Sequence, residues 1–128
     1  MNKPLTLKGR ILSFKYAGQG VWLTIKSQHN AWIHAVATIV VVIAGFALRI
    51  SKIEWCVIIL TCTAVWTAEA LNTALEFLAD AVSKETHPVI GQAKDVAAGA
   101  VLITAFGALI VGVLVFGPHI LVLLNIPR

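Results

Sequence analysis

Three long, predominantly apolar stretches constrain the fold of this chain more than any other feature. They cover residues 31–48, 53–82 and 95–116, and short polar segments containing Lys, Ser, Pro or Gly separate them. A helix needs about 20 apolar residues to cross the hydrocarbon core of a bilayer. The sequence therefore predicts an all-α membrane protein with three transmembrane helices, built as a single domain over residues 1–128.

Composition leaves little room for anything else. Of the 128 residues, 59% are hydrophobic and only 12% are charged. Soluble domains carry roughly 25% charged residues, about twice this share. The composition therefore excludes a sizeable soluble domain beside the membrane helices.

Residues 5–27 have the pattern of an amphipathic helix that lies on a membrane surface. Apolar residues such as Ile11 and Phe14 share one side, and Lys8 and Lys15 share a neighbouring side. Long basic side chains at such positions reach towards anionic headgroups. We therefore expect this segment to contact lipid and not nucleic acid.

The distribution of basic residues predicts the orientation in the membrane. The N-terminal segment and residues 83–94 together hold seven of the ten Lys and Arg residues, whereas the opposite side holds three. Positive residues accumulate on the cytoplasmic side of membrane proteins. The N-terminus and the 83–94 segment are therefore expected to face the cytoplasm.

The segment EALNTALEFLAD, residues 69–80, places acidic residues in an otherwise apolar helix. At about 100° per residue, Glu69, Asn72, Glu76 and Asp80 fall within an arc of roughly 80°. A charged residue in mid-membrane costs about 2.5–3.5 kcal/mol on insertion scales. The polar stripe is therefore expected to face protein, water or a bound cation.

The residue types around this stripe predict a chemistry. Carboxylates are the ligands that hard divalent cations prefer. Lys94 and Asp95 follow Gly91 at the expected start of the third membrane helix, and a helix N-terminus beside a Lys favours phosphate. The pattern therefore indicates carboxylates, a metal ion and a polyphosphate at the membrane surface.

Three motifs resemble one family, the small prokaryotic diacylglycerol kinases and undecaprenol kinases. They are SFKYAGQG, EALNTALEFLAD and SKETHPVIGQAKDVAAGAVLI, and the resemblance extends over nearly the whole chain. It implies a surface helix and three transmembrane helices, assembled as a homotrimer with shared active sites in the bacterial inner membrane. It also implies transfer of the γ-phosphate of MgATP to the hydroxyl of a lipid, either diacylglycerol or undecaprenol.

The resemblance also implies roles for particular residues. Glu69 resembles the general base and Glu76 the main Mg²⁺ ligand, and Asn72 would support the lipid site by hydrogen bonding. Residues implied in nucleotide contacts are Tyr16, Glu76, Glu85, His87, Lys94 and Asp95. Arg10 is the best match for a basic residue near the start of the surface helix that contacts the lipid substrate.

The chain departs from the family pattern at two positions. Gln28 stands where members commonly have a second metal-binding Glu, and Gln19 stands where many have Lys. An amide oxygen can ligate a hard cation but carries no charge, so Gln28 is expected to bind the metal more weakly. The departures leave phosphoryl transfer as the expected chemistry.

Alternatives remain open from the residues themselves. The chain could be a catalytically weakened family member, or a non-enzymatic oligomeric membrane protein whose acids clamp helices or line a pore. Clustering of the acids at one membrane face argues against a pore. Asp80 is explained equally well by a functional role and by a structural one, as a cap or a salt-bridge partner. His29 and His34 are expected to be interface histidines.

Overall fold

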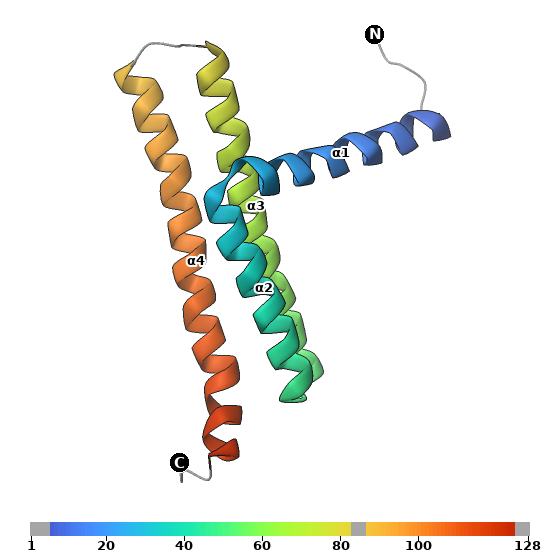
Figure 1. Ribbon diagram of the computed structural model, residues 1–128, viewed down its shortest axis with the longest axis vertical. Coiled ribbons are helices and arrows are strands. Elements are labelled where there is room, and N and C mark those ends of the chain that lie inside the picture. The colour runs from blue at the N-terminus through green and yellow to red at the C-terminus, as the bar shows by residue number, and fades with distance from the viewer. Residues whose placement is uncertain (1–5, 83–86, 125–128) are drawn as a thin grey trace.

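Four helices form the part of the protein that the computed structural model describes, residues 6–82 and 87–124. They are α1 (Leu7–Ser27), α2 (His29–Ala47), α3 (Lys52–Val82) and α4 (Pro88–Leu123), and no strand occurs in these two ranges (Figure 1). Helices α2, α3 and α4 are each long and apolar enough to cross a membrane. The predicted all-α membrane fold is therefore confirmed.

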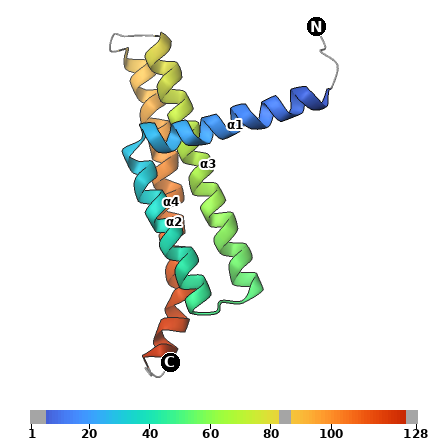
Figure 2. The same cartoon turned by 45° about the vertical axis from the view of Figure 1, so that its right-hand side comes forward.

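Helix α1 runs away from the bundle, across the direction of the other three helices (Figures 1 and 2). Thr6 caps its first turn, because the Thr6 hydroxyl accepts a hydrogen bond from the backbone N–H of Gly9 at 3.2 Å. Its contacts are with α2 and α3. Apolar side chains such as Phe14 and Trp22 are exposed along it, which suits a helix that lies in the membrane interface.

A tight turn joins α2 to α3. Arg49 adopts the left-handed conformation with φ of 51°. The N–H of Arg49 donates to the carbonyl of Phe46, and the N–H of Ile50 donates to the carbonyl of Gly45. This bond pattern is the Schellman motif, which ends a helix by satisfying its last carbonyls.

Gly45 lets the two arms of this hairpin approach closely. A Cβ at position 45 would lie 2.7 Å from the Trp55 ring and 3.2 Å from Ile50 Cδ1. The Trp55 ring also packs against the Phe46 ring in a tilted arrangement, with centroids 4.9 Å apart and 51° between the ring planes, which limits its freedom to move. Residue 45 must therefore be the smallest residue if this packing is to persist.

We expect Gly45→Ala to destabilise the protein by about 1–3 kcal/mol, the usual range for overpacking. Thermal unfolding in detergent micelles measures the effect. Gly107→Ala is the matched control, because a Cβ at position 107 would meet nothing within 4 Å. Equal unfolding temperatures for the two variants would show that the contact with Trp55 is not tight.

Helix α4 is longer at both ends than the sequence predicted. It was expected over residues 95–116 and is observed over Pro88–Leu123, with Pro118 inside it. Pro88 is compatible with the helix because it occupies the first turn, where a backbone N–H has no helical partner. Residues 117–123, which follow the expected span, are therefore part of α4, and residues 125–128 lie outside the described ranges.

Helices α3 and α4 pack along much of their length and are held at both ends. Near the α2–α3 turn, a small apolar core forms from Ile50, Ile58, Val115 and Phe116. There Glu54 Oε1 also lies 2.9 Å from His119 Nε2. At the other end, Lys94 Nζ lies 3.0 Å from Asp80 Oδ1, so Asp80 is a salt-bridge partner, one of the two structural roles considered for it.

Candidate active site between α2, α3 and α4

Glu69 is the most deeply buried polar side chain described, with 1% of its surface exposed. Neither of its carboxylate oxygens has a hydrogen-bond partner among the described residues. Burying an ionisable group without partners is costly, so such a group is rarely kept for packing alone. Its position on α3 therefore marks a candidate functional site.

Two turns further along α3, a second carboxylate, Glu76, is held by amide groups. Asn72 Nδ2 donates to Glu76 Oε1 at 2.9 Å, and Gln28 Nε2 donates to Glu76 Oε2. Gln28 lies at the junction of α1 and α2, so this contact ties the junction to α3. The structure thus brings together Gln28, Asn72 and Glu76, three of the residues that the sequence singled out.

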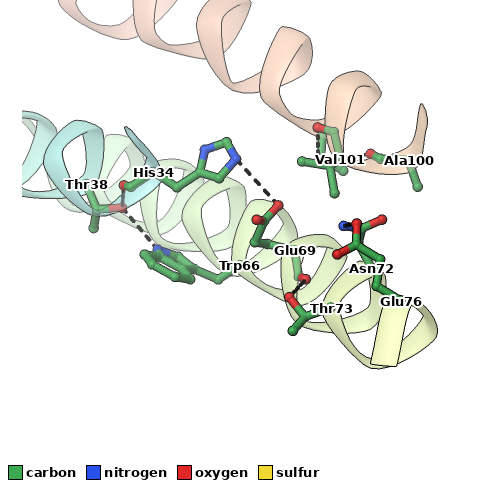
Figure 3. A network of polar contacts seen from close by, with 10 residues as sticks. His34, Thr38, Trp66, Glu69, Asn72, Thr73, Glu76, Ala100 and Val101 are labelled. Carbon is green, nitrogen blue, oxygen red and sulfur yellow. Dashed lines mark hydrogen bonds and ion pairs between the residues drawn. The ribbon is translucent and has the colours of Figure 1, made fainter. Parts of the chain in front are cut away.

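Helix α2 also approaches Glu69 from the other side. His34 Nε2 lies 3.8 Å from Glu69 Oε2 (Figure 3). One turn away, Trp66 Nε1 donates to Thr38 Oγ1 at 3.1 Å, and Thr38 Oγ1 donates to the carbonyl of His34 at 2.7 Å. Two side-chain contacts therefore fix the register of α2 against α3.

These polar groups open into a cavity of about 340 Å³. Its polar lining comes from Asn30, His34, Glu69, Asn72 and Glu76. Helix α4 closes the other wall with Ala98, Val101, Leu102 and Ala105, none of which has a polar side chain. The cavity therefore has a mainly polar wall on α2 and α3, which includes two carboxylates of α3, and an apolar wall on α4.

A second, largely apolar cavity of about 570 Å³ adjoins the first. The two share Ile33, His34 and Ala105 in their linings, and the second extends towards Phe116 and Ile120 of α4. Thr38 and Thr61, which also line it, use their hydroxyl groups in hydrogen bonds to their own helices. This cavity therefore suits a hydrocarbon chain better than a polar ligand.

The depth of the site follows from helix geometry. Counted from Ile53 at 1.5 Å per residue, Glu69 lies about 24 Å along α3 and Glu76 about 35 Å, whereas a hydrocarbon core is about 30 Å thick. With one boundary of the hydrocarbon core placed at Ile53, we expect Glu69 just inside the apolar region and Glu76 just outside it. The two carboxylates are then expected on opposite sides of one membrane boundary.

Residues predicted to contact nucleotide are not gathered in one place. Lys94 pairs with Asp80, while Asp95 and His87 are exposed on the first turns of α4 and its cap. Arg10 and Tyr16 are exposed on α1, which runs away from the bundle, and neither lines the cavity (Figure 2). Glu85 lies outside the described residues.

A model of the prokaryotic diacylglycerol kinase family matches residues 15–116. The chain belongs to this family. The matched range takes in the whole of α2 and α3 and most of α4, and therefore every residue that lines the 340 Å³ cavity. The resemblance drawn from the three motifs is confirmed.

Characterised relatives carry two different names. The undecaprenol kinase of Bacillus subtilis (strain 168) is 41% identical over 108 residues, which cover 84% of this chain and 88% of that protein. The diacylglycerol kinase of Synechocystis sp. is 39% identical over 115 residues, covering 89% and 66%, respectively. The diacylglycerol kinase of Escherichia coli (strain K12) is 30% identical over 101 residues, covering 73% and 83%.

The sequence did not single out two features of the site. His34 was expected to be an interface histidine, and the structure places it beside Glu69. Asn30 was not considered, and it lines the polar cavity. The available signal was the helical spacing of Asn30, His34 and Thr38, which puts three polar groups on one face of α2.

Proposed function

We propose that this protein is an ATP-dependent lipid kinase that phosphorylates the hydroxyl of a membrane lipid, diacylglycerol or undecaprenol. Membership of the prokaryotic diacylglycerol kinase family supports the kinase activity. The observation that carries the proposal is the buried Glu69 carboxylate, which has no hydrogen-bond partner within residues 6–82 and 87–124 and lines the 340 Å³ cavity.

Glu69 is suited to act as the general base. The oxygen of the lipid hydroxyl attacks the γ-phosphorus of ATP, the bond from that phosphorus to the β–γ bridging oxygen breaks, and ADP leaves. The hydroxyl proton passes to a Glu69 oxygen as the new bond forms. Phosphoryl transfer otherwise requires mainly positioning and charge stabilisation.

The donor set near Glu76 fits a hard cation in type but is incomplete in number. It offers oxygen atoms from Glu76, Gln28 and Asn72, and the buried Asn72 Oδ1 atom has no hydrogen-bond partner among the described residues. Within residues 6–82 and 87–124, no group of three or more His, Cys, Asp or Glu residues could hold a metal. Glu76 and Gln28 would hold Mg²⁺, with other ligands coming from phosphate or water.

When bound, Mg²⁺ supplies charge neutralisation for the triphosphate. Gln28 would serve as a ligand only with its amide turned so that Oε1 faces the ion, because Nε2 now faces Glu76. Asn72 would keep Glu76 oriented by the same hydrogen bond that it makes now.

The lipid and the nucleotide would approach from opposite sides of the boundary. The apolar cavity would receive part of the hydrocarbon chain and leave the hydroxyl beside Glu69. Lys94, Asp95, His87 and Glu85 would contact the nucleotide from the α3–α4 end. Arg10 and Tyr16 would contribute only where α1 meets a bound substrate or another subunit.

The proposal also includes an oligomeric state and a membrane location for the protein. A homotrimer with shared active sites is proposed because the family resemblance implies one. The excess of Lys and Arg at the N-terminal side and the α3–α4 end supports a cytoplasmic active site in the bacterial inner membrane.

The decisive assay is transfer of radiolabelled γ-phosphate to lipid by the purified protein in mixed micelles. Diacylglycerol, undecaprenol and a lipid without a hydroxyl are compared, each with Mg²⁺ and with a chelator. We expect label in at least one lipid alcohol only when Mg²⁺ is present. The absence of Mg²⁺-dependent labelling in both alcohols would overturn the proposal.

A further inference from the structure

His34 occupies an unusual place, because its ring lies where the two cavities meet and faces the buried carboxylate. Its side chain is 14% exposed, whereas that of Glu69 is 1% exposed. His34 lines both the 340 Å³ cavity and the 570 Å³ cavity. A ring at this junction is in contact both with Glu69 and with the space next to it.

Few other side chains in the cavity wall can orient Glu69. Helix α4 contributes only apolar side chains to it. Asn72 already donates its amide hydrogen to Glu76. No described hydrogen bond joins Asn30 to Glu69. His34 is therefore the lining residue whose polar atom comes within ion-pairing distance of the Glu69 carboxylate.

The neighbouring hydrogen bonds hold the His34 backbone in place. Thr38 accepts from Trp66 on α3 and donates to the His34 carbonyl on α2 (Figure 3). Trp66 precedes Glu69 by three residues, and Thr38 follows His34 by four, so both pairs lie on facing turns. The register of α2 against α3 is thus fixed one turn away from His34, and this register places the His34 ring beside Glu69.

We propose that His34 is the positioning residue for Glu69, donating from Nε2 to Oε2 and leaving Oε1 directed at the lipid hydroxyl. This role rests on the proposed lipid kinase activity. The present separation of 3.8 Å is longer than a hydrogen bond. Catalytic hydrogen bonds are commonly long in substrate-free structures and shorten when substrate binds.

Two substitutions of similar size separate this role from simple packing. His34→Leu fills the space without a donor, whereas His34→Gln keeps an N–H donor at a similar reach. We expect His34→Leu to lower kcat by roughly 10- to 100-fold, the usual loss when an orienting partner is removed. We expect His34→Gln to recover at least half of that loss on a logarithmic scale, with the KM for ATP unchanged in both variants.

His29→Leu is the matched control on the same helix. His29 is exposed and lines neither cavity. The kcat of His29→Leu is therefore expected to stay within twofold of that of the unsubstituted protein. Equal losses in His34→Leu and His34→Gln would assign His34 a packing role and overturn the proposal. So would full activity in His34→Leu.

A measurement without turnover keeps this test independent of the kinase proposal. The imidazole nitrogens of the four histidines are observed by NMR in ¹⁵N-histidine-labelled protein, and His34→Leu assigns one set of signals. We expect Glu69→Gln to shift the His34 signals alone. Glu54→Gln is the positive control, because Glu54 lies 2.9 Å from His119 and should shift only that ring.

The outcomes distinguish the two proposals. Unmoved His34 signals in Glu69→Gln would overturn the positioning role, whatever the lipid assay shows. Shifted signals in a protein without lipid kinase activity would overturn the proposed function and the catalytic meaning of the contact, while leaving the contact itself established.

Discussion

Replacing Glu69 with Gln is expected to lower kcat for lipid phosphorylation by at least about 100-fold, the lower limit for loss of a general base. The amide has the same shape as the carboxylate but cannot accept the proton of the lipid hydroxyl. Because nucleotide contacts lie elsewhere, the KM for ATP is expected to stay within twofold. Steady-state kinetics with saturating lipid measure both quantities.

Glu69→Gln is expected to lower kcat without lowering the stability of the folded protein. Both Glu69 oxygens are buried and have no hydrogen-bond partner in the part of the chain that the structure describes, so a neutral side chain removes a desolvation cost. We therefore expect the unfolding temperature of Glu69→Gln in micelles to equal or exceed that of the unsubstituted protein. A large loss of both activity and stability would instead favour Glu69 as a clamp between helices.

Glu54→Gln is the matched control for this experiment. It makes the same substitution on the same helix, but Glu54 lies at the far end, beside Ser51 and His119. We expect its kcat to stay within twofold, since no part of the candidate site contacts it. If Glu54→Gln lost as much activity as Glu69→Gln, charge on α3 in general would be required, and not a base at position 69.

Gln28→Glu is expected to lower the Mg²⁺ concentration for half-maximal activity by about tenfold, equivalent to about 1.4 kcal/mol. In the present structure the Gln28 amide donates to Glu76 Oε2. A carboxylate at position 28 would place like charges together and would need a cation between them. A Mg²⁺ titration of the initial rate gives the measurement.

The same substitution should make stability depend on the metal. In a chelator, Gln28→Glu is expected to unfold at a lower temperature than the unsubstituted protein, because the hydrogen bond to Glu76 is replaced by repulsion. With saturating Mg²⁺ the difference should shrink or reverse, since a ligand that binds only the folded state stabilises it. An unchanged Mg²⁺ response in both assays would remove Gln28 from the metal site.

The membrane helices could be predicted from sequence because hydrophobicity alone decides them. Helix α3 has the bounds Lys52–Val82, and the expected helix covered residues 53–82. Helix α4 contains the expected span, residues 95–116, and extends beyond it at both ends. Pro88 sits in the first turn, and helix α4 continues through Pro118 to Leu123.

The candidate site was predictable only in part. Glu69, Asn72 and Glu76 share one helix, so their common face follows from the helical repeat. The contact of His34 with Glu69 joins residues 35 positions apart, and it depends on the register of α2 against α3. That register is set by the Trp66–Thr38 hydrogen bond, which no pattern within one helix reveals.

The expected placement of Glu69 and Glu76 on either side of one membrane boundary has a consequence for the surrounding lipid. A bilayer made of longer acyl chains would raise that boundary along α3, and one made of shorter chains would lower it. The lipid hydroxyl moves with the boundary, whereas the carboxylates stay fixed to the helix. Acyl-chain length in the host membrane would therefore set how well the two reactants line up, and with it the rate of phosphorylation.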